Sequence, residues 1–247
     1  MKISIITVCY NSAETLEKTI LSVANQTYVD IEYIIVDGNS NDNTLAIIQK
    51  HLETVTQWIS ESDKGLYDAM NKGIAMATGD LIGILNSDDT FYSSTVIEDI
   101  IAFHSVNSIY ASVGNINQHK ANGKIIRKYS SEYWKPERLK IGFMPPHPSI
   151  FFKKELFEKY GNYRLDFKIG ADYELIVRFF LKNKIKWKYS GITTTSMLVG
   201  GLSSSGNSSY QRITKEIQKA LYLNKIEHSP FKIKMRFVWK IIGFLKK

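Results

Sequence analysis

Short apolar runs alternate with helix-like segments along the first part of the chain, and this alternation restricts the fold more than any other feature. The four runs cover 3–8, 31–36, 56–60 and 81–85. Between the first two runs, Leu16, Ile20 and Val23 recur at the spacing of one helical face. Strands that alternate with helices predict an α/β fold of the Rossmann-like kind, with a mostly parallel central sheet and helices on both faces.

The second half of the chain is less regular. Two strand-like runs flank Asn122–Gly123 and predict a hairpin, and 170–182 has the apolar spacing of a helix. No linker-like segment interrupts the chain before Glu227. We therefore expect one domain and a short tail, with these bounds: 1–228 for the domain, about 1–115 and 116–228 for its two halves, and 229–247 for the tail.

Cysteine content and charge exclude several classes of protein. The single cysteine, Cys9, excludes an intrachain disulfide and a cysteine-based metal cluster, and it fits a reducing compartment. Residues 1–10 are expected to form a strand rather than a secretion signal, and no run approaches the roughly 18 apolar residues of a membrane-spanning helix. The net charge is +8, but six Lys and Arg residues lie in 231–247. Because the rest of the chain is close to neutral, it lacks the broad basic surface that binds nucleic acid, and we expect no nucleic-acid partner.

Acidic residues follow three successive predicted strands. Asp37 follows the second strand, Asp63 the third, and Asp88–Asp89 the fourth. The carboxyl ends of parallel strands meet at one edge of the sheet, which is where ligands bind in such folds. Adjacent carboxylates repel each other, so Asp88–Asp89 is either a solvated loop pair or a pair held together by a cation. The shared edge favours a binding site, and a divalent metal is the simplest cation for it.

Four motifs in a fixed order carry a resemblance to a known family. They read TVCYNS, VDGNSNDNT, SDKGLYDAMNKGI and NSDD, and they resemble the family 2 glycosyltransferases of the GT-A fold. The resemblance covers about residues 1–205, because PPHPSIFF, GADYEL and GGLSS also look like acceptor-side signatures of that family. The pattern is most similar to bacterial transferases that build surface or capsular polysaccharide.

The resemblance implies a metal site and a nucleotide-sugar site. Asp89 would bind Mn²⁺ or Mg²⁺ directly, and Asp88 would contact the ribose or a metal-bound water, or share the metal. Such a hard cation would neutralise the leaving diphosphate of the donor. The other residues implied in nucleotide-sugar binding are Asp37 for the base, Thr7, Tyr10 and Asn11 for the base and ribose, and Asp63, Lys64 and Lys72.

Several of these residues have a second interpretation. Asn11 is also a good helix N-cap, and Asp37 is also suited to a turn. Lys72 would reach a phosphate or lie in solvent. Gly65 and Gly73 are expected to let the backbone approach a ligand closely.

On the acceptor side, the resemblance implies Asp172 as the catalytic base, because the attacking hydroxyl must lose its proton as the new bond forms. The alternative is that Asp172 stabilises a helix N-terminus. His147, between two prolines, would face the donor phosphates or acceptor, or pack in a rigid turn. Gly201 and Ser203 would belong to a lid over the acceptor, or to a solvated loop.

The tail has the pattern of a basic amphipathic helix. Over 231–247, apolar side chains share one broad face, and most of the cations lie opposite. This favours a helix on an anionic membrane surface over a helix docked on the domain. A lipid-linked acceptor would suit such a location, at the inner face of the cytoplasmic membrane.

The sequence therefore predicts a metal-dependent, inverting glycosyltransferase of the hexosyltransferase class (EC 2.4). The expected donor is a UDP-sugar, and the expected acceptor is a glycan or a lipid-linked glycan. One alternative is a nucleotidyltransferase that makes the activated sugar, but TVCYNSAET lacks the glycines and cations expected after its first strand. The other is a non-catalytic nucleotide-sugar-binding protein, against which Asp88, Asp89 and Asp172 together argue.

Overall fold

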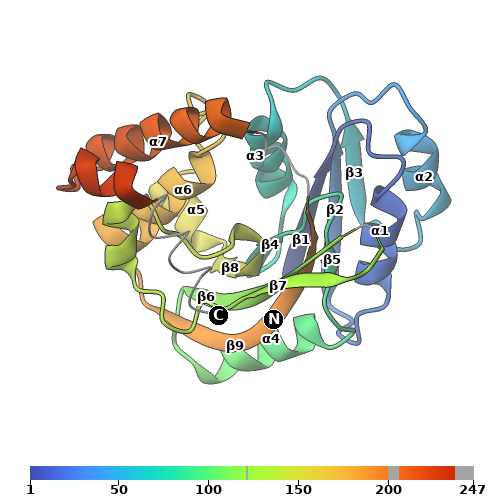
Figure 1. The fold of residues 1–247 in the computed structure, drawn as a ribbon. Coiled ribbons are helices and arrows are strands. Elements are labelled where there is room, and N and C mark those ends of the chain that lie inside the picture. Colours follow the sequence, from blue (N-terminus) through green and yellow to red (C-terminus); the bar gives the residue numbers. More distant parts are fainter. Residues whose placement is uncertain (121, 200–205, 237–247) are drawn as a thin grey trace. The chain divides into compact units, whose positions relative to one another are not determined.

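The chain divides into two compact units made of interleaved segments. The computed structural model describes residues 1–120, 122–199 and 206–236 (Figure 1). Unit 1 consists of 1–132, 145–163 and 185–199, and unit 2 consists of 133–144, 164–184 and the described part of 200–247. The expected halves, 1–115 and 116–228, do not coincide with these units, because the chain returns to unit 1 after each of the first two segments of unit 2.

Within the described residues, nine strands form one sheet, and all of them belong to unit 1. They are β1 (Ile3–Cys9), β2 (Ile31–Asp37), β3 (Gln57–Ser60), β4 (Leu81–Ile84), β5 (Thr90–Phe91), β6 (Ala111–His119), β7 (Ile125–Tyr129), β8 (Ile150–Lys153) and β9 (Trp187–Leu198). Their order is β3-β2-β1-β4-β8-β6-β9-β5, with β7 paired to β6. The β-branched and aromatic side chains of β1 and β2 fit strands that are covered on both faces.

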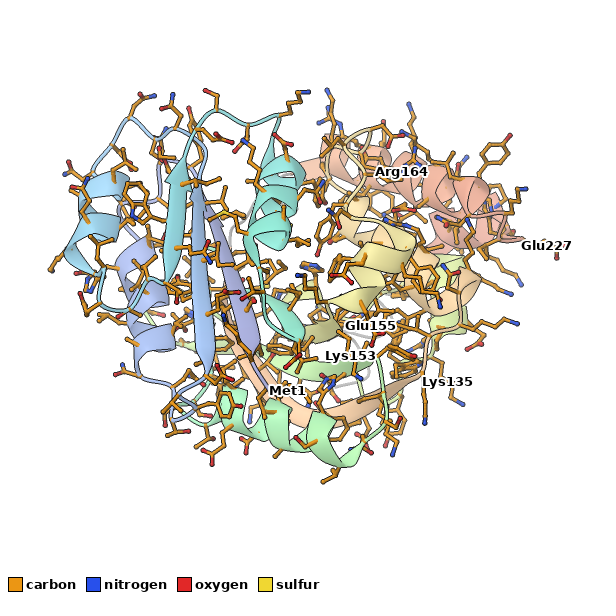
Figure 2. The ribbon with its side chains drawn as sticks, turned by 180° about the vertical axis from the view of Figure 1, so that it is seen from behind. Met1, Lys135, Lys153, Glu155, Arg164 and Glu227 are labelled. Carbon is orange, nitrogen blue, oxygen red and sulfur yellow. The ribbon has the colours of Figure 1, made fainter. Side chains whose placement is uncertain are left out.

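The sheet is parallel in its first half and mixed in its second. β1 pairs in parallel with β2 and β4, and β2 pairs in parallel with β3, as the sequence predicts. β8 then runs antiparallel to β4 and β6, although β6 and β9 are parallel. The hairpin of β6 and β7 is confirmed, with Gly123 at a positive φ of 79° in its turn. In Figure 2, Lys153 at the end of β8 lies beside Glu155, with Nζ 3.9 Å from Oε1.

Helices cover both faces of the parallel half, so the α/β prediction is confirmed. α1 (Leu16–Ala24), α2 (Thr44–Lys50) and α4 (Val96–Val106) bury apolar side chains in one core with alternate residues of β1 and β2. α3 (Leu66–Met76) packs on the other face (Figure 1). A β-carbon at Gly73 of α3 would lie 2.4 Å from Ile6 Cγ2, so this glycine lets the helix approach β1. The expectation that Gly73 lets the backbone approach a ligand stays a prediction.

A buried carboxylate connects several segments at the edge of the sheet where β1 and β2 begin. Glu32 accepts hydrogen bonds from Ser4 Oγ at 2.5 Å and from the N–H and hydroxyl of Thr78 at 2.6 Å each. Lys2 Nζ lies 2.9 Å from its Oε1. Burial would raise the pKa of Glu32, but these donors outweigh it and lower the pKa to about 2. The charge of Glu32 is therefore a structural feature of unit 1.

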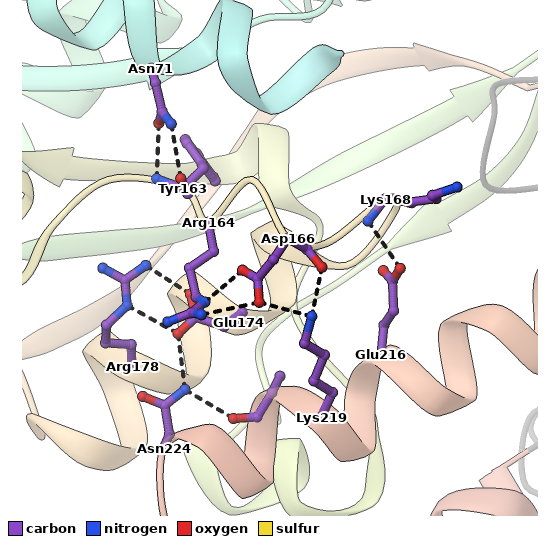
Figure 3. Close-up of polar contacts among 11 residues, drawn as sticks. Asn71, Tyr163, Arg164, Asp166, Lys168, Glu174, Arg178, Glu216, Lys219 and Asn224 are labelled. Atoms are coloured by element: carbon purple, nitrogen blue, oxygen red, sulfur yellow. Dashed lines mark hydrogen bonds and ion pairs between the residues drawn. The ribbon is translucent and has the colours of Figure 1, made fainter. Parts of the chain in front are cut away.

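Unit 2 is helical. It contains a 3₁₀ helix η1 (Pro136–Ile141), α6 (Ala171–Ile176), a π-helical segment η3 (Val177–Lys182) and α7 (Gly206–Leu223). Glu174 on α6 is buried and pairs with Arg178, whose Nη2 lies 2.7 Å from Oε2, and Asn224 Nδ2 donates to the same carboxylate at 3.0 Å (Figure 3). The paired charge and the amide link α6 to the residues that follow α7.

The described part of the tail docks on unit 2. Residues 230–236 are helical, with Ile233 fully buried and Phe231 71% exposed. The guanidinium of Arg236 lies over the Tyr210 ring at 4.9 Å and donates from Nη2 to Thr214 at 3.3 Å. Tyr210 donates to the Lys234 carbonyl at 3.0 Å. The rest of the expected amphipathic helix, 237–247, lies outside the described residues. Among the residues that are described, no helix is long and apolar enough to cross a bilayer.

Candidate functional site

Hydrogen bonds join the loops that leave the carboxyl ends of the parallel strands. Ser12, after β1, lies 3.0 Å from the hydroxyl of Ser87, after β4. The Asn11 N–H donates to Ser40 Oγ at 2.8 Å, which joins the loops after β1 and β2. Ser60, at the end of β3, donates to Asp37 at 2.7 Å. The predicted convergence of these loops at one edge of unit 1 is therefore present.

Asp37 lies at this edge, but its carboxylate is fully engaged within the protein. Its exposed fraction is 0%. Ser40 donates to it twice, from the backbone N–H at 3.0 Å and from the hydroxyl at 2.5 Å, in addition to the bond from Ser60. Cys9 Sγ lies 3.6 Å from Oδ1, and burial together with the Asp37 charge raises the pKa of the thiol. Asp37 thus holds the turn after β2 in place.

The first loop places its three predicted residues differently. Thr7 is buried, and its hydroxyl accepts a hydrogen bond from Tyr33 at 3.1 Å. Asn11 adopts a positive φ of 47°, and its Oδ1 accepts from the Asn41 N–H at 2.9 Å. It is not the N-cap of α1, since that helix begins after Thr15. Tyr10 is 60% exposed, so a ligand can reach its ring over a large area.

The loop after β3 contains a cation that is already paired. Lys72 Nζ lies 2.8 Å from Glu61 Oε1 and donates to the Ser62 carbonyl at 2.9 Å. The hydrogen bond with Glu61 raises the pKa of Lys72. Lys64 is exposed, and its backbone N–H donates to Asp68 at 3.0 Å. Lys64 is therefore better placed than Lys72 to meet a phosphate without breaking an existing ion pair.

The paired carboxylates after β4 differ in their environments. Asp89 has an exposed fraction of 0%, and its Oδ2 accepts from Asn86 Nδ2 at 3.1 Å. Its Oδ1 is buried and makes no hydrogen bond of normal geometry to the described residues, although the backbone of Leu198 approaches the carboxylate and opposes the rise of its pKa. Burial, followed by the charge of Asp88, raises the pKa of Asp89 to about 7. Asp88 is partly exposed, and burial raises its pKa as well.

These two carboxylates suit a divalent cation. No group of three or more His, Cys, Asp or Glu side chains in the described ranges could hold a metal. A cation that also binds a diphosphate and several waters needs only one or two protein carboxylates. The unpartnered Oδ1 of Asp89 is the kind of oxygen that a cation would satisfy, since an uncompensated buried charge is costly. The residues present therefore fit a Mg²⁺ or Mn²⁺ site.

His147 is held inside unit 1 by a tyrosine. It begins the short helix η2 (His147–Ser149), and its Nε2 lies 2.7 Å from Tyr163 Oη. Burial lowers the pKa of His147 to about 4, so the ring is neutral at pH 7. Asn71 of α3 binds both backbone polar groups of Tyr163, at 2.8 and 2.9 Å (Figure 3). These contacts fix His147 through its neighbours, which is consistent with packing in a rigid turn.

In unit 2, Asp172 lies in the first turn of α6, and its Oδ1 accepts from the Tyr173 N–H at 2.7 Å. The loop before it is held by Glu216 of α7. That carboxylate accepts from the N–H groups of Lys168, Ile169 and Gly170 at 2.9, 3.0 and 2.7 Å, the first of which is drawn in Figure 3. No sequence pattern distinguishes Glu216 from an ordinary acid on a helix. Gly201 and Ser203 lie outside the described residues.

The chain is similar in sequence to known glycosyltransferases. The family described as "Glycosyl transferase family 2" matches residues 4–166. An uncharacterized glycosyltransferase of Mycobacterium tuberculosis is 34% identical over 177 residues, which cover 71% of this chain and 68% of that protein. A PGL/p-HBAD biosynthesis glycosyltransferase of Mycobacterium bovis is 29% identical over 214 residues, which cover 82% of this chain and 79% of that protein.

Solved structures share the fold. S. aureus TarS 1–349 in complex with UDP-GlcNAc matches with a TM-score of 0.69 at 18% identity, over 90% of this chain and 66% of that chain. The mannosyltransferase PcManGT from Pyrobaculum calidifontis, in complex with GDP-Man and Mn²⁺, matches with a TM-score of 0.66 at 16% identity, over 94% and 67%. The chain thus spans just under two thirds of the TarS structure. At these identities the likeness establishes the GT-A fold alone.

Proposed function

Because the chain belongs to glycosyl transferase family 2, we propose that it moves a sugar from a nucleoside diphosphate sugar to a glycan or lipid-linked acceptor in surface polysaccharide synthesis. The observation that carries this proposal is the pair Asp88–Asp89 at the strand-end edge of unit 1. One buried oxygen of the pair lacks a partner in the described chain, and the pKa of Asp89 is raised. A cation and the diphosphate it binds would satisfy that oxygen.

Asp88 and Asp89 would hold the ion, with Asp89 as the direct ligand and Asp88 at the more exposed side. When bound there, Mn²⁺ or Mg²⁺ supplies positive charge that stabilises the leaving diphosphate. Asn86 orients Asp89 by donating to its other carboxylate oxygen at 3.1 Å. PcManGT carries Mn²⁺ in its complex with a nucleotide sugar, which supports this assignment.

The nucleotide would bind along the loops after β1, β2 and β3. Tyr10 offers an exposed aromatic ring for the base, and Lys64 offers an exposed cation for a phosphate. Asn11, Asp37 and Thr7 would act by shaping the loops, since their side chains are bound to protein groups. A uridine nucleotide is the expected donor base, and the UDP-GlcNAc complex of TarS supports it.

The proposed reaction is a single displacement with inversion. The acceptor hydroxyl attacks the anomeric carbon while its proton passes to the Asp172 carboxylate, and the bond to the diphosphate breaks. Glu216 keeps the loop before Asp172 in one conformation. His147 is neutral, so beside a donor phosphate it would donate a hydrogen bond and add no charge.

The acceptor and the cellular location are proposed together. The M. bovis relative is named for PGL/p-HBAD biosynthesis, and the acceptor proposed for this chain is a glycan or a lipid-linked glycan. A site at the inner face of the cytoplasmic membrane would present such an acceptor, and 231–247 would contact the membrane surface through its cations other than the buried Arg236. Flotation with anionic liposomes tests this location. Equal recovery of the full chain and a chain ending at Glu227 would contradict it.

A donor screen tests the proposed function directly. Thermal shifts should be measured with UDP-, TDP- and GDP-sugars, each with MnCl₂ and with EDTA. We expect a Mn²⁺-dependent shift for at least one donor, and slow Mn²⁺-dependent hydrolysis of that donor. Asp89→Ala should abolish both, whereas Asp30→Asn, at an exposed acid of the same unit, should leave both unchanged. Absence of any metal-dependent shift would refute the proposal, and binding without transfer or hydrolysis would indicate a non-catalytic protein.

A further inference from the structure

We propose that Thr19 of α1, supported by Ser22, is a positioning residue for Asp89, the residue proposed above to bind the cation. Thr19 acts through the backbone of Asp89 and raises the affinity for Mn²⁺ or Mg²⁺ without touching the ion. The inference rests on the proposed function, because it concerns the metal carboxylate of the same site. Two observations carry it: the way α1 pairs with β5, and the number of contacts that fix Asp89.

The short strand β5 begins directly after Asp88–Asp89 and lies at the end of the strand order of the sheet. On one side it pairs with β9, and the Tyr92 N–H donates to the Thr194 carbonyl at 2.9 Å. On its other side no strand pairs with it among the described residues. Backbone groups that point to that side need other partners, because an unpaired buried N–H or C=O costs free energy.

Side chains of α1 supply these partners (Figure 1). Thr19 Oγ1 donates to the Asp89 carbonyl at 2.7 Å, and the Phe91 N–H donates to Ser22 Oγ at 3.2 Å. Thr19 and Ser22 are three residues apart, so they lie on the same face of the helix. Two hydroxyls of α1 therefore take the place of a neighbouring strand along the first residues of β5.

The hydroxyl of Thr19 serves this contact rather than its own helix. Within a helix, a Ser or Thr hydroxyl commonly donates to the carbonyl three or four residues earlier. Ser22 does so, donating to the Thr19 carbonyl at 2.8 Å. Thr19 is fully buried and donates instead to the loop that carries Asp89. Valine would have nearly the same shape, so the contribution of threonine at this position is the hydrogen bond.

The bond from Thr19 completes the set of contacts that fix Asp89. The Asp89 N–H donates to the Asn86 carbonyl at 3.0 Å, and Asp89 Oδ2 accepts from Asn86 Nδ2 at 3.1 Å. With the carbonyl held by Thr19, both backbone polar groups and one carboxylate oxygen are bound, while Oδ1 stays available for a cation. A ligand fixed in advance loses less freedom when the ion binds. Loss of a contact that orients a metal ligand lowers metal affinity by about tenfold to hundredfold.

Binding of Mn²⁺ provides the test. Mn²⁺ should be titrated into the protein with UDP and followed by electron paramagnetic resonance, with UDP alone as the reference, for the wild type, Thr19→Val, Thr19→Ser and Ser4→Ala. We expect Thr19→Val to raise the Kd of Mn²⁺ at least about tenfold. Thr19→Ser keeps the hydroxyl and should restore a Kd close to that of the wild type. Ser4→Ala removes a buried hydroxyl that donates to Glu32 at the opposite edge of the sheet, so it should lower stability and leave the Kd unchanged.

The outcomes separate this inference from the proposed function. A wild-type Kd in Thr19→Val, or an equal rise of the Kd in Thr19→Val and Ser4→Ala, would overturn the role of Thr19 and leave the proposed function intact. If Thr19→Val does not fold, Ser22→Ala takes its place, because it removes the acceptor of the Phe91 N–H and keeps Thr19. Its Kd should rise in the same direction, and an unchanged Kd would overturn the inference. A wild type that binds no more Mn²⁺ than UDP alone would refute both.

Discussion

Replacing Asp89 by asparagine removes a buried charge that the fold leaves incompletely partnered, and we expect the metal-free protein to become more stable as a result. Asparagine has nearly the same shape as aspartate, and its oxygen can still accept from Asn86. The variant should nevertheless lose metal-dependent activity, because a neutral amide is a poor ligand for Mn²⁺ or Mg²⁺. Stability and activity should therefore change in opposite directions at this residue.

The size of the effect follows from the pKa. Folding raises the pKa of Asp89 from about 3.9, the value in an unfolded chain, to about 7. A carboxyl whose pKa is raised on folding costs no stability below about pH 4, and the cost grows as the pH rises to about 7 and then stays constant. Linkage gives a cost of about 1–2 kcal/mol at pH 5 and about 4 kcal/mol at pH 8. Asp89→Asn should recover most of that cost.

Urea unfolding in EDTA at pH 5 and pH 8 measures this difference. The variant should exceed the wild type by more at pH 8 than at pH 5, and Asp30→Asn should match the wild type at both. Adding MnCl₂ with UDP should then stabilise the wild type and leave Asp89→Asn unchanged. A variant less stable than the wild type at pH 8, or an offset equal at both pH values, would show that the charge of Asp89 is compensated in the folded protein.

Three further substitutions test other parts of the structure. Glu32→Gln should lower the free energy of unfolding by about 3 kcal/mol at pH 7, and the difference should fade as the pH drops from about 4 towards 2, since the pKa of Glu32 is lowered by folding; urea midpoints along that series check it. Glu216→Gln should lower the rate of transfer about tenfold through a less ordered loop before Asp172, with the donor KM unchanged, which initial-rate kinetics would show. A chain ending at Glu227 should lose about 2 kcal/mol of stability because Ile233 is no longer buried, as measured by urea unfolding.

The first half of the fold could be predicted because its signals are local. The apolar runs of β1, β2 and β4 are bounded by turn residues, and the acids after them fall at one edge by the geometry of parallel sheets. The order of the strands in the second half could not be predicted from local signals. Paired residues of β4 and β8 lie at least 68 positions apart in the sequence, and those of β6 and β9 more than 70, so the pairing depends on contacts that no local pattern records.

The residue types of the candidate site could be predicted from the sequence, but the hydrogen-bond partners and the burial of those residues could not. The sequence places Asp37, Asp63 and Asp89 after strands, and each is the same kind of side chain. It does not show that Ser40 and Ser60 turn towards Asp37, nor that Gly38 leaves room for Asp63. These facts depend on side-chain directions set by the folded loops. Hydrogen-bond partners, and not spacing, therefore distinguish the structural acids from those that can meet a ligand.

The contrast between Asp37 and Asp89 extends this distinction to experiment. Loss of activity is expected on replacing either residue, since one shapes the donor loops and the other would bind the ion, so activity alone cannot separate their roles. Stability can. Asp37→Asn turns an amide N–H towards one of its donors, Ser40 or Ser60, and should destabilise the protein by about 1–3 kcal/mol, the cost of leaving buried polar groups unpaired. Asp89→Asn should stabilise the metal-free protein. If urea unfolding in EDTA at pH 8 gave shifts of the same sign for both variants, the two acids would not differ as their hydrogen-bond partners indicate.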